Sequence, residues 1–359
     1  MQADFHYAVI YVLSRLTGFS QEDAKIISYS SQYVDDATNG GFIKFTNHPM
    51  YYRINSAHAL RDISNLDDLA NQHSWMPFHF LPGNQPADHN RLGFVSRLIC
   101  RENSLVAQDM VKEAFLYKSD ENGLHRLGVT LHVYADTWSH QGFVGIKHDI
   151  NHITNLYDEE SVRDFGCLIR AKIDDLTDIF GCEIIDKYLA LGHGAALTCP
   201  DEPWLKWSYT DYFGSRIYVD NTERFMRAVD HIYMVLKRYY LGDPIAQVEP
   251  LDTSIRNKIQ ALFEKFTDPD GQTRNLLWLD KIRENHFGFG AEDISYVSKG
   301  IGSWKFHALG TENEFDSADD LYIYKDTFPL SDWKKLHDAI KDHWSFVIFK
   351  LLPDHGVIF

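Results

Sequence analysis

The sequence predicts an all-α protein, a multi-helix bundle with minor irregular or short-strand content near the C-terminal third. Apolar residues recur at helical spacing through most of the 359 residues. Glycine and Asn-Gly pairs stand where several of these stretches stop, as expected at helix ends. The chain also carries 18 histidines and only four cysteines. Because imidazole is the commonest metal ligand, a metal site between the helices is part of this prediction.

The first half of the chain contains several predicted helices. Residues 5–17 are apolar on most sides and end before Gly18. Ser20 opens a second helix, with Asp23 three residues later in a capping-box arrangement, and Asn39–Gly41 should end it. Further on, we expect an extended or irregular segment at 42–56, a weak helix at 56–70, a proline-rich loop at 76–86, and helices at 104–118 and 124–139.

The second half continues the helical pattern. Helices are expected at 161–180, 183–192, 221–241, 253–266 and 331–352, and short strands are expected within 285–330. The segment 242–250 contains two prolines and is the best candidate for a linker. We therefore predict a helical metal-binding domain at 1–245, with a C-terminal helical extension at 250–359 packed on it.

Composition limits the function and the compartment. The chain has 35 Lys and Arg against 51 Asp and Glu, a net charge of −16, which argues against binding long nucleic acids through a basic surface. No stretch reaches the ~18 apolar residues of a membrane span, and no charged n-region precedes the first apolar segment. The four cysteines are widely spaced, which is typical of free thiols in a reducing compartment. We expect a cytoplasmic protein, with export by a leaderless route left open.

One helical segment carries the clearest chemical signal. His132, Asp136 and His140 stand four residues apart, so they fall on one stripe about 80° wide. The outer two are about 12 Å apart along the axis and cannot bind the same ion. Each can share an ion with Asp136, so this carboxylate is expected to bridge two cations, an arrangement known in the cleavage of phosphate esters.

Other ligands must come from elsewhere in the chain, since one helix supplies few ligands to one ion. The candidates are nitrogen and carboxylate donors on separate predicted helices, which is what a closed helical metal site needs. They are His6, Asp35 or Asp36, His58 and His193, with Asp201 as a further ligand or a catalytic base.

Two other histidine segments have different interpretations. His79 is flanked by aromatic residues and is interpreted as structural or as a support to the ligands. His148 and Asp149 form a local pair typical of the central dyad of an HD-type phosphohydrolase, a rival to the first hypothesis.

The pattern of these residues resembles the all-helical superfamily of zinc-dependent phospholipases C and single-strand nucleases. Those enzymes share an N-terminal ligand, an early Asp, a middle His, a helical H-x3-D pair and later His and carboxylate ligands. The resemblance implies that the metal shell is made by His6, Asp35 or Asp36, His58, His132, Asp136, His140, His193 and Asp201. The phrases Asp-Phe-His-Tyr, Ser-Gln-Tyr-Val-Asp-Asp and Ala-Asp-Thr-Trp-Ser-His also resemble a family of uncharacterised bacterial proteins over about residues 1–240.

These observations favour a zinc-type hydrolase of a small phosphodiester or phosphomonoester, with Asp136 and Asp201 as catalytic residues. The number of ions and the oligomeric state stay open. Two alternatives remain: the HD-type phosphohydrolase that uses His148 and Asp149, and a non-catalytic interaction protein whose closed metal site only holds the helices together.

Overall fold

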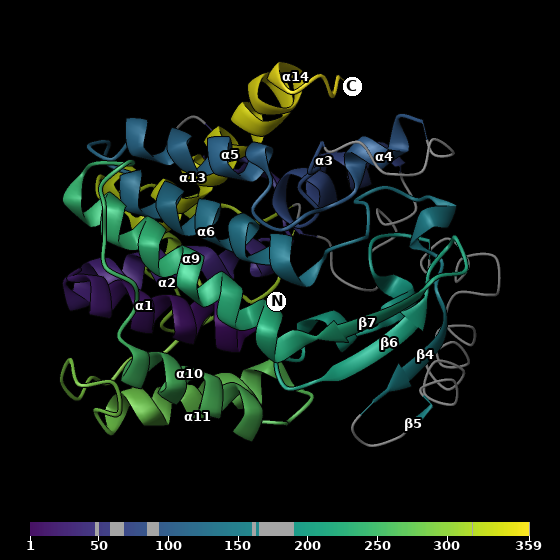
Figure 1. Cartoon of the computed structure of the whole chain (residues 1–359). Coiled ribbons are helices and arrows are strands. Elements are labelled where there is room, and N and C mark those ends of the chain that lie inside the picture. Colours follow the sequence, from purple (N-terminus) through teal and green to yellow (C-terminus); the bar gives the residue numbers. More distant parts are fainter. Residues whose placement is uncertain are drawn as a thin grey trace.

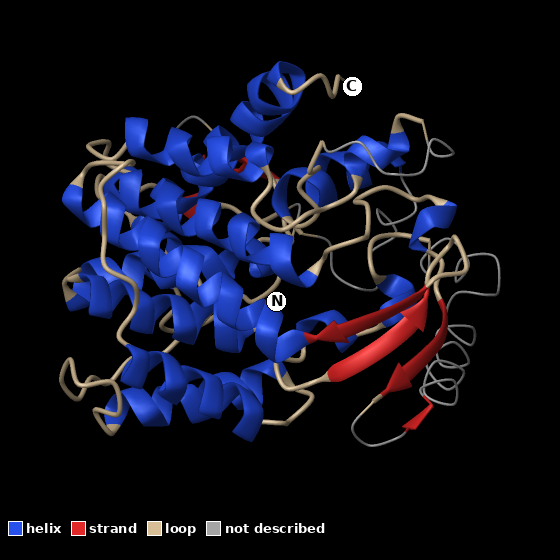
Figure 2. Cartoon of the chain, viewed as in Figure 1, coloured by secondary structure: helices blue, strands red, loops and turns tan. Residues whose placement is uncertain are grey.

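A helical body packs beside a four-stranded sheet in the computed structural model (Figures 1 and 2). The structure describes residues 1–46, 50–57, 68–84, 93–159, 163–164, 190–317 and 319–358. About 52% of it is helix and 10% is strand, in three small sheets, so the all-α prediction is wrong. The largest sheet also lies in the middle of the chain and not near the C-terminal third.

The helices of the N-terminal half form the centre of the body. Their bounds are η1 (Asp4–Val9), α1 (Ile10–Thr17), α2 (Gln21–Asp36), α3 (Asp68–Phe78), α4 (Val95–Leu98), α5 (Leu105–Leu116) and α6 (Gly123–Ser139). Ser20 caps α2 by accepting a hydrogen bond from the Asp23 amide at 3.0 Å, as predicted. The predicted loop at 76–86 is wrong at its start, because α3 continues through Pro77 to Phe78.

The helices of the C-terminal half cover this centre. They are α9 (Asn221–Leu241), α10 (Thr253–Lys265), α11 (Gly271–Arg283), α12 (Trp304–Leu309), α13 (Asp332–Phe346), η7 (Val347–Leu351) and α14 (Leu352–Asp354). Asp220 caps α9, and Gly242 ends it in a left-handed conformation at the end of the predicted helix at 221–241. The predicted helices at 161–180 and 183–192 fall largely outside the described residues, and the described pair 163–164 is a strand.

The main sheet is antiparallel with the order β5-β4-β6-β7. Its strands are β4 (Thr154–Asp158), β5 (Arg163–Asp164), β6 (Lys206–Thr210) and β7 (Arg216–Asp220). The β6–β7 turn is built by Asp211, whose carboxylate accepts hydrogen bonds from the Phe213 and Ser215 amides at 2.9 and 2.8 Å. Gly214 adopts the positive φ of 83° that this turn requires.

Two small strand pairs complete the fold. Strand β1 (Gly41–Ile43) pairs antiparallel with β3 (Tyr51–Arg53), and β2 (Phe45–Thr46) pairs parallel with β8 (Tyr322–Ile323). The predicted extended segment at 42–56 is therefore confirmed where it is described. Within the described part of 285–330, strand structure is confined to β8.

Helix α6 lies at the centre of the body and packs closely on α2. A Cβ built on Gly128 would lie 2.4 Å from the Ile27 carbonyl oxygen and 2.6 Å from the Ser30 Cβ. Glycine at this position and small residues on α2 therefore let the two helices approach closely. This contact places the C-terminal end of α2, with Asp35, beside the middle of α6, with His132.

The segment after residue 250 packs on both sides of the N-terminal helices (Figure 1). Arg274 on α11 forms a fully buried ion pair with Asp4, with Nε 2.7 Å from Oδ2. Glu292 accepts a hydrogen bond from Arg15 at 2.8 Å and one from the Tyr11 hydroxyl. The extension thus holds the first turns of the chain in the interior.

Candidate metal centre

Helix α6 brings its histidine and carboxylate ridge into the interior. His132 and Asp136 are 0% and 1% exposed, and His140 caps the end of the helix at 4%. The ridge therefore faces the protein core and not solvent. The N-terminus of the chain lies at the same place, in the middle of the molecule (Figure 1).

Three groups of side chains along this ridge could hold metal ions. They are His6 with Asp35 and His132, His79 with His132 and Asp136, and His140 with His193 and Asp201. In each group the three candidate ligand atoms lie within 4.8 Å of one another. His132 belongs to two groups, so neighbouring ions would share part of their surroundings.

Asp136 occupies the centre of the cluster. Its Oδ1 lies 3.1 Å from His6 Nε2, and its Oδ2 lies 3.2 Å from His79 Nδ1 and 3.4 Å from His132 Nε2. This arrangement fits the bridging role expected of it. His140 differs from the expectation, because its Nε2 faces Asp201 Oδ1 at 3.5 Å and not Asp136.

Backbone carbonyls fix the orientation of three of the rings. His79 Nε2 lies 3.1 Å from the Ser56 oxygen, His140 Nδ1 lies 2.7 Å from the His79 oxygen, and His193 Nδ1 lies 2.9 Å from the Leu197 oxygen. A carbonyl only accepts, so each of these nitrogens must carry the proton. In a neutral ring, the opposite nitrogen then presents its lone pair to the cluster. The hydrogen bond from the protonated nitrogen to a carbonyl is usual for a histidine that binds a metal.

Several polar atoms in the cluster have no hydrogen-bond partner among the described residues. They include both ring nitrogens of His6 and Nδ1 of His132. His6 Nε2 comes within 3.1 Å of Asp136 without making a hydrogen bond. Buried polar atoms are normally satisfied. Lone pairs from imidazole and carboxylate that face one another in the interior fit a bound divalent cation.

A positive group already lies among the carboxylates. The Met1 amino group lies 2.7 Å from Asp136 Oδ1 and 3.0 Å from Asp201 Oδ1. Burial alone would lower the pKa of this amino group, but the two carboxylates outweigh burial and raise its pKa to about 11. The pocket between Asp136 and Asp201 therefore stabilises positive charge.

Three of the buried histidines favour the neutral form, while the central carboxylate stays ionised. Burial lowers the pKa of His6, His132 and His193 to about 4 in each case. Burial would raise the pKa of Asp136, but the Met1 ammonium and the histidines outweigh it and hold this pKa well below its ordinary value. Neutral imidazole and ionised carboxylate are the forms that bind metals.

The segment with Asp201 is anchored by a buried asparagine at the start of α9. Asn221 Nδ2 donates to the carbonyl oxygens of Cys199 and Glu202 at 2.6 and 2.8 Å. Its Oδ1 accepts a hydrogen bond from Trp207 Nε1 at 3.1 Å. These bonds fix the short helix η5 (Cys199–Asp201) and with it the Asp201 carboxylate, so the sheet region contributes to the site.

Gly192 positions the neighbouring His193. It has a positive φ of 55°, and a Cβ at this position would lie 2.5 Å from the Phe80 ring. The Phe80 ring stacks on His140 and lies against His193, with centroid distances of 4.6 and 5.8 Å. An aromatic wall therefore orients two of the candidate ligands.

Most of the predicted site residues come together in this cluster. Those that do are His6, Asp35, His132, Asp136, His140, His193 and Asp201. Asp36 does not, because its carboxylate accepts hydrogen bonds from Tyr296 and Gln32 at 2.6 and 3.2 Å. His58 lies outside the described residues. His79 was interpreted as a supporting residue, yet it stands among the candidate ligands.

The dyad proposed for an HD-type enzyme lies elsewhere. His148 Nδ1 accepts a hydrogen bond from the Ile150 amide at 3.1 Å and so caps the short helix η3 (Asp149–Asn151). The Asp149 side chain is 73% exposed. Neither residue belongs to the metal-competent groups found among the described residues.

The comparison with protein-family models matches residues 1–351 to a family of unknown function (DUF6765). The chain belongs to this family. The match spans the candidate metal centre and most of the C-terminal extension, so the family includes both parts. The comparisons with curated proteins and with solved structures found no match. Among the described residues, no helix is long and apolar enough to cross a membrane.

Proposed function

We propose that this member of the family is a metal-dependent hydrolase of a small phosphoric ester, with zinc as the metal. One observation carries the proposal: carbonyl-oriented histidines present their free nitrogens to ionised carboxylates in the interior. His193 shows it best, with Nδ1 bound to the Leu197 oxygen and Nε2 3.5 Å from Asp201. Nitrogen and carboxylate donors on separate elements are typical zinc ligands.

The roles of the chain's own residues follow from their positions. His6, Asp35, His79 and His132 would bind on one side of Asp136, and His140, His193 and Asp201 on the other. Bound ions would polarise the phosphoryl oxygens and lower the pKa of a water molecule toward about 7. Asp201 and His193 retain 10% and 20% side-chain exposure, and Asp35 at the other end retains 32%, so solvent reaches the cluster at both ends.

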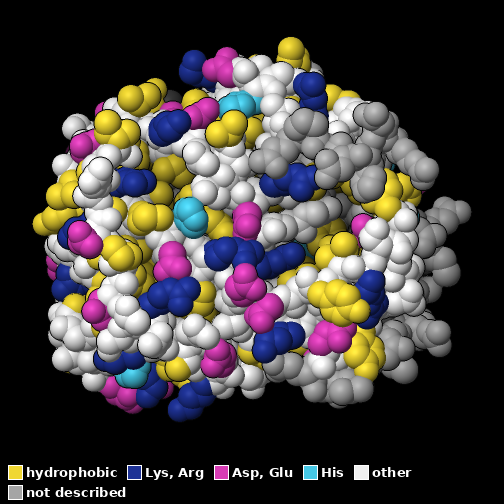
Figure 3. All heavy atoms as spheres, viewed as in Figure 1, with side chains coloured by type: hydrophobic (Ala, Val, Ile, Leu, Met, Phe, Trp, Pro, Cys, Tyr) yellow, Lys and Arg dark blue, Asp and Glu magenta, His cyan; other side chains and the backbone are white. Residues whose placement is uncertain are grey.

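A small substrate suits the charge of the protein better than a long polyanion. The net charge is −16, and Figure 3 shows acidic and basic side chains interspersed on the face in view. Nucleic-acid binding generally needs clustered positive charge. We therefore favour a small phosphodiester or phosphomonoester.

The first experiment measures metal content. The full-length protein purified without chelators should contain zinc by mass spectrometry, and His132→Ala and Asp136→Asn should lose most of it. His307→Ala is the matched control, because His307 is exposed and outside the cluster. A metal-free native protein, or full occupancy in both variants, would refute the metal centre.

The second experiment separates a catalyst from a structural site. Bis(p-nitrophenyl) phosphate and p-nitrophenyl phosphate should be hydrolysed by the zinc-loaded protein, with activity lost in EDTA and regained with zinc. The deep burial of most ligands favours a second candidate, a closed metal site that only stabilises the fold. That alternative predicts bound zinc, a large loss of thermal stability on chelation, and no hydrolysis of either ester.

A further inference from the structure

A cavity of about 600 Å³ lies beside the metal centre and shares none of its candidate ligands. It is within the usual size range of small-molecule sites. Three of its lining residues, Gln141, Gly142 and Phe143, directly follow His140. The Cys100 amide donates to the Phe143 oxygen at 2.8 Å and the Gly142 amide donates to the Cys100 oxygen at 3.1 Å, so this wall is held in place.

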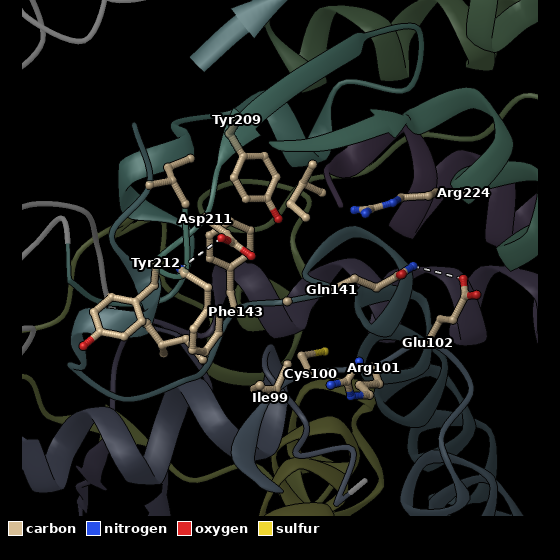
Figure 4. Close-up of a pocket in the computed structure, with 15 residues that line it drawn as sticks. Ile99, Cys100, Arg101, Glu102, Gln141, Phe143, Tyr209, Asp211, Tyr212 and Arg224 are labelled. Carbon is tan, nitrogen blue, oxygen red and sulfur yellow. Dashed lines mark hydrogen bonds between the residues drawn. The ribbon is translucent and has the colours of Figure 1, made fainter. Parts of the chain in front are cut away.

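Two arginines line the cavity without an ion-pair partner among the described residues. Arg224, in the first turn of α9, makes no ion pair or hydrogen bond with any described residue, and burial lowers its pKa. The buried Nε of Arg101 also has no partner among the described residues. Figure 4 shows the two side chains on either side of Gln141. Both arginines are partly buried. A guanidinium partly removed from water without an anion is costly, so such groups are candidates for a binding site.

The acidic residues of the cavity are already engaged elsewhere. Glu102 forms an ion pair with Arg227 at 3.0 Å and accepts a hydrogen bond from Gln141 at 3.0 Å. The Asp211 carboxylate is engaged by the backbone amides of the β6–β7 turn. Neither carboxylate forms an ion pair with Arg101 or Arg224, so both guanidinium groups are left for an anionic ligand.

The remaining walls are aromatic and aliphatic. Tyr209, Tyr212 and Phe213 come from β6 and its turn, Ile217 comes from β7, and Ile153 immediately precedes β4. The Phe143 and Tyr209 rings stack with centroids 6.0 Å apart. Positive charge at one side and aromatic surface at the other select an anionic group on an apolar or planar body.

We propose that this cavity is a second binding site, for a small molecule that carries a phosphoryl or carboxylate group on an aromatic body. The guanidinium of Arg224, together with that of Arg101, binds the oxyanion, since its planar fork matches both groups. The aromatic walls hold the body. The site is independent of the proposed hydrolase activity and does not require a metal ion.

The test is calorimetric titration of the full-length protein with three probes of one shape: phenylphosphonate, benzoate and benzyl alcohol. We expect the anions to bind about tenfold or more tightly than the alcohol. The preferred anion identifies the chemistry of the natural ligand. Arg224→Gln should weaken anion binding about tenfold, whereas Arg283→Gln, an exposed arginine on α11, should not.

Two further variants keep the test decisive. Asp136→Asn damages the metal centre and should leave anion binding unchanged, because the cavity does not include Asp136. A phosphonate that bound to zinc instead would lose affinity in this variant. Ile217→Trp fills the cavity and should abolish binding even if Arg224→Gln fails to fold. Without ligand, Arg224→Gln should be at least as thermally stable as the native protein, because it removes an uncompensated charge. Absence of anion binding, or binding that depends on Asp136 and not on Arg224, overturns the proposal.

Discussion

His79 joins the candidate ligands although it lies 57 residues before Asp136 in the sequence. Its Nε2 donates to the Ser56 oxygen and its Nδ1 faces the Asp136 and Asp35 carboxylates. We predict that His79→Ala reduces zinc affinity as strongly as His132→Ala, by about tenfold or more. His73→Ala on α3, the helix that ends just before His79, is the control, because the His73 ring is exposed. Equal zinc affinity in His79→Ala and the native protein would show that His79 only supports the fold.

A second prediction concerns pH and a histidine away from the ligands. His343 on α13 donates through Nε2 to the Pro77 oxygen at 3.1 Å, and its burial lowers its pKa to about 4. The ordinary pKa of 6.5 applies in the unfolded chain. Between about pH 6.5 and pH 4, the His343 ring is therefore protonated in the unfolded state and neutral in the folded state. The free energy of unfolding decreases as the pH falls through this range.

His343→Gln keeps a donor for the Pro77 oxygen and removes this proton. In urea unfolding with EDTA present, the native protein should lose stability more steeply than the variant, by up to about 1.4 kcal/mol per pH unit near pH 5. Parallel pH profiles for the two proteins would contradict a neutral His343.

Residue spacing was enough to find the ridge on α6, because a helix with His, Asp and His four apart must place them on one stripe. It was not enough to choose between Asp35 and Asp36. That choice depends on Tyr296, which lies 260 residues away and binds Asp36. His79 was missed for the same reason, since its neighbours Pro77 and Phe80 indicate a loop and its partners come from distant segments.

At the scale of the element, the close packing of α2 and α6 decides the width of the site. Gly128→Ala would place a methyl group 2.4 Å from the Ile27 oxygen, which is backbone and cannot turn away. We expect a loss of about 1–3 kcal/mol in the free energy of unfolding and weaker zinc binding, because Asp35 moves away from His132. Urea denaturation measures the first effect and competition with a zinc indicator the second.

Lys112→Ala on the exposed side of α5 serves as the control for this variant and should change stability by less than about 0.5 kcal/mol. A Gly128→Ala protein as stable as the native one would mean that the helices can separate freely, and Asp35 would then not be held by this contact.

Helices with caps and glycine stops were predicted well, as α2 and α9 show. The sheet was missed, although β6 and β7 have residues typical of strands around a turn with Asp211 and Gly214. The strands are only five residues long and their burial does not alternate cleanly. The sequence was therefore interpreted as helical throughout this region, and the two strands were not recognised.

At the scale of the whole molecule, the C-terminal extension completes the centre through Arg274. This residue is fully buried and pairs with Asp4 through Nε and Nη2, and it also donates to the oxygens of Gln2 and Asp268 at 2.9 and 2.6 Å. Asp4 stands two residues before His6, so the ion pair fixes the turn that presents His6 to Asp136. Residues more than 260 positions apart thus form one structural unit.

We predict that Arg274→Met destabilises the protein by about 3–5 kcal/mol, because it leaves the Asp4 carboxylate buried without a partner. Asp4→Asn should also destabilise the protein, and the double variant should lose less stability than the sum of the two single losses, since neither charge is then left alone.

Arg283→Met on the same helix is the control. Arg283 makes only exposed ion pairs, so this variant should change stability by less than about 1 kcal/mol. If the stability losses of Arg274→Met and Asp4→Asn simply add in the double variant, the Arg274–Asp4 ion pair does not couple the extension to the N-terminal turn. If they do couple, zinc affinity should fall in Arg274→Met and not in Arg283→Met, because the position of His6 depends on a helix that supplies no ligand itself.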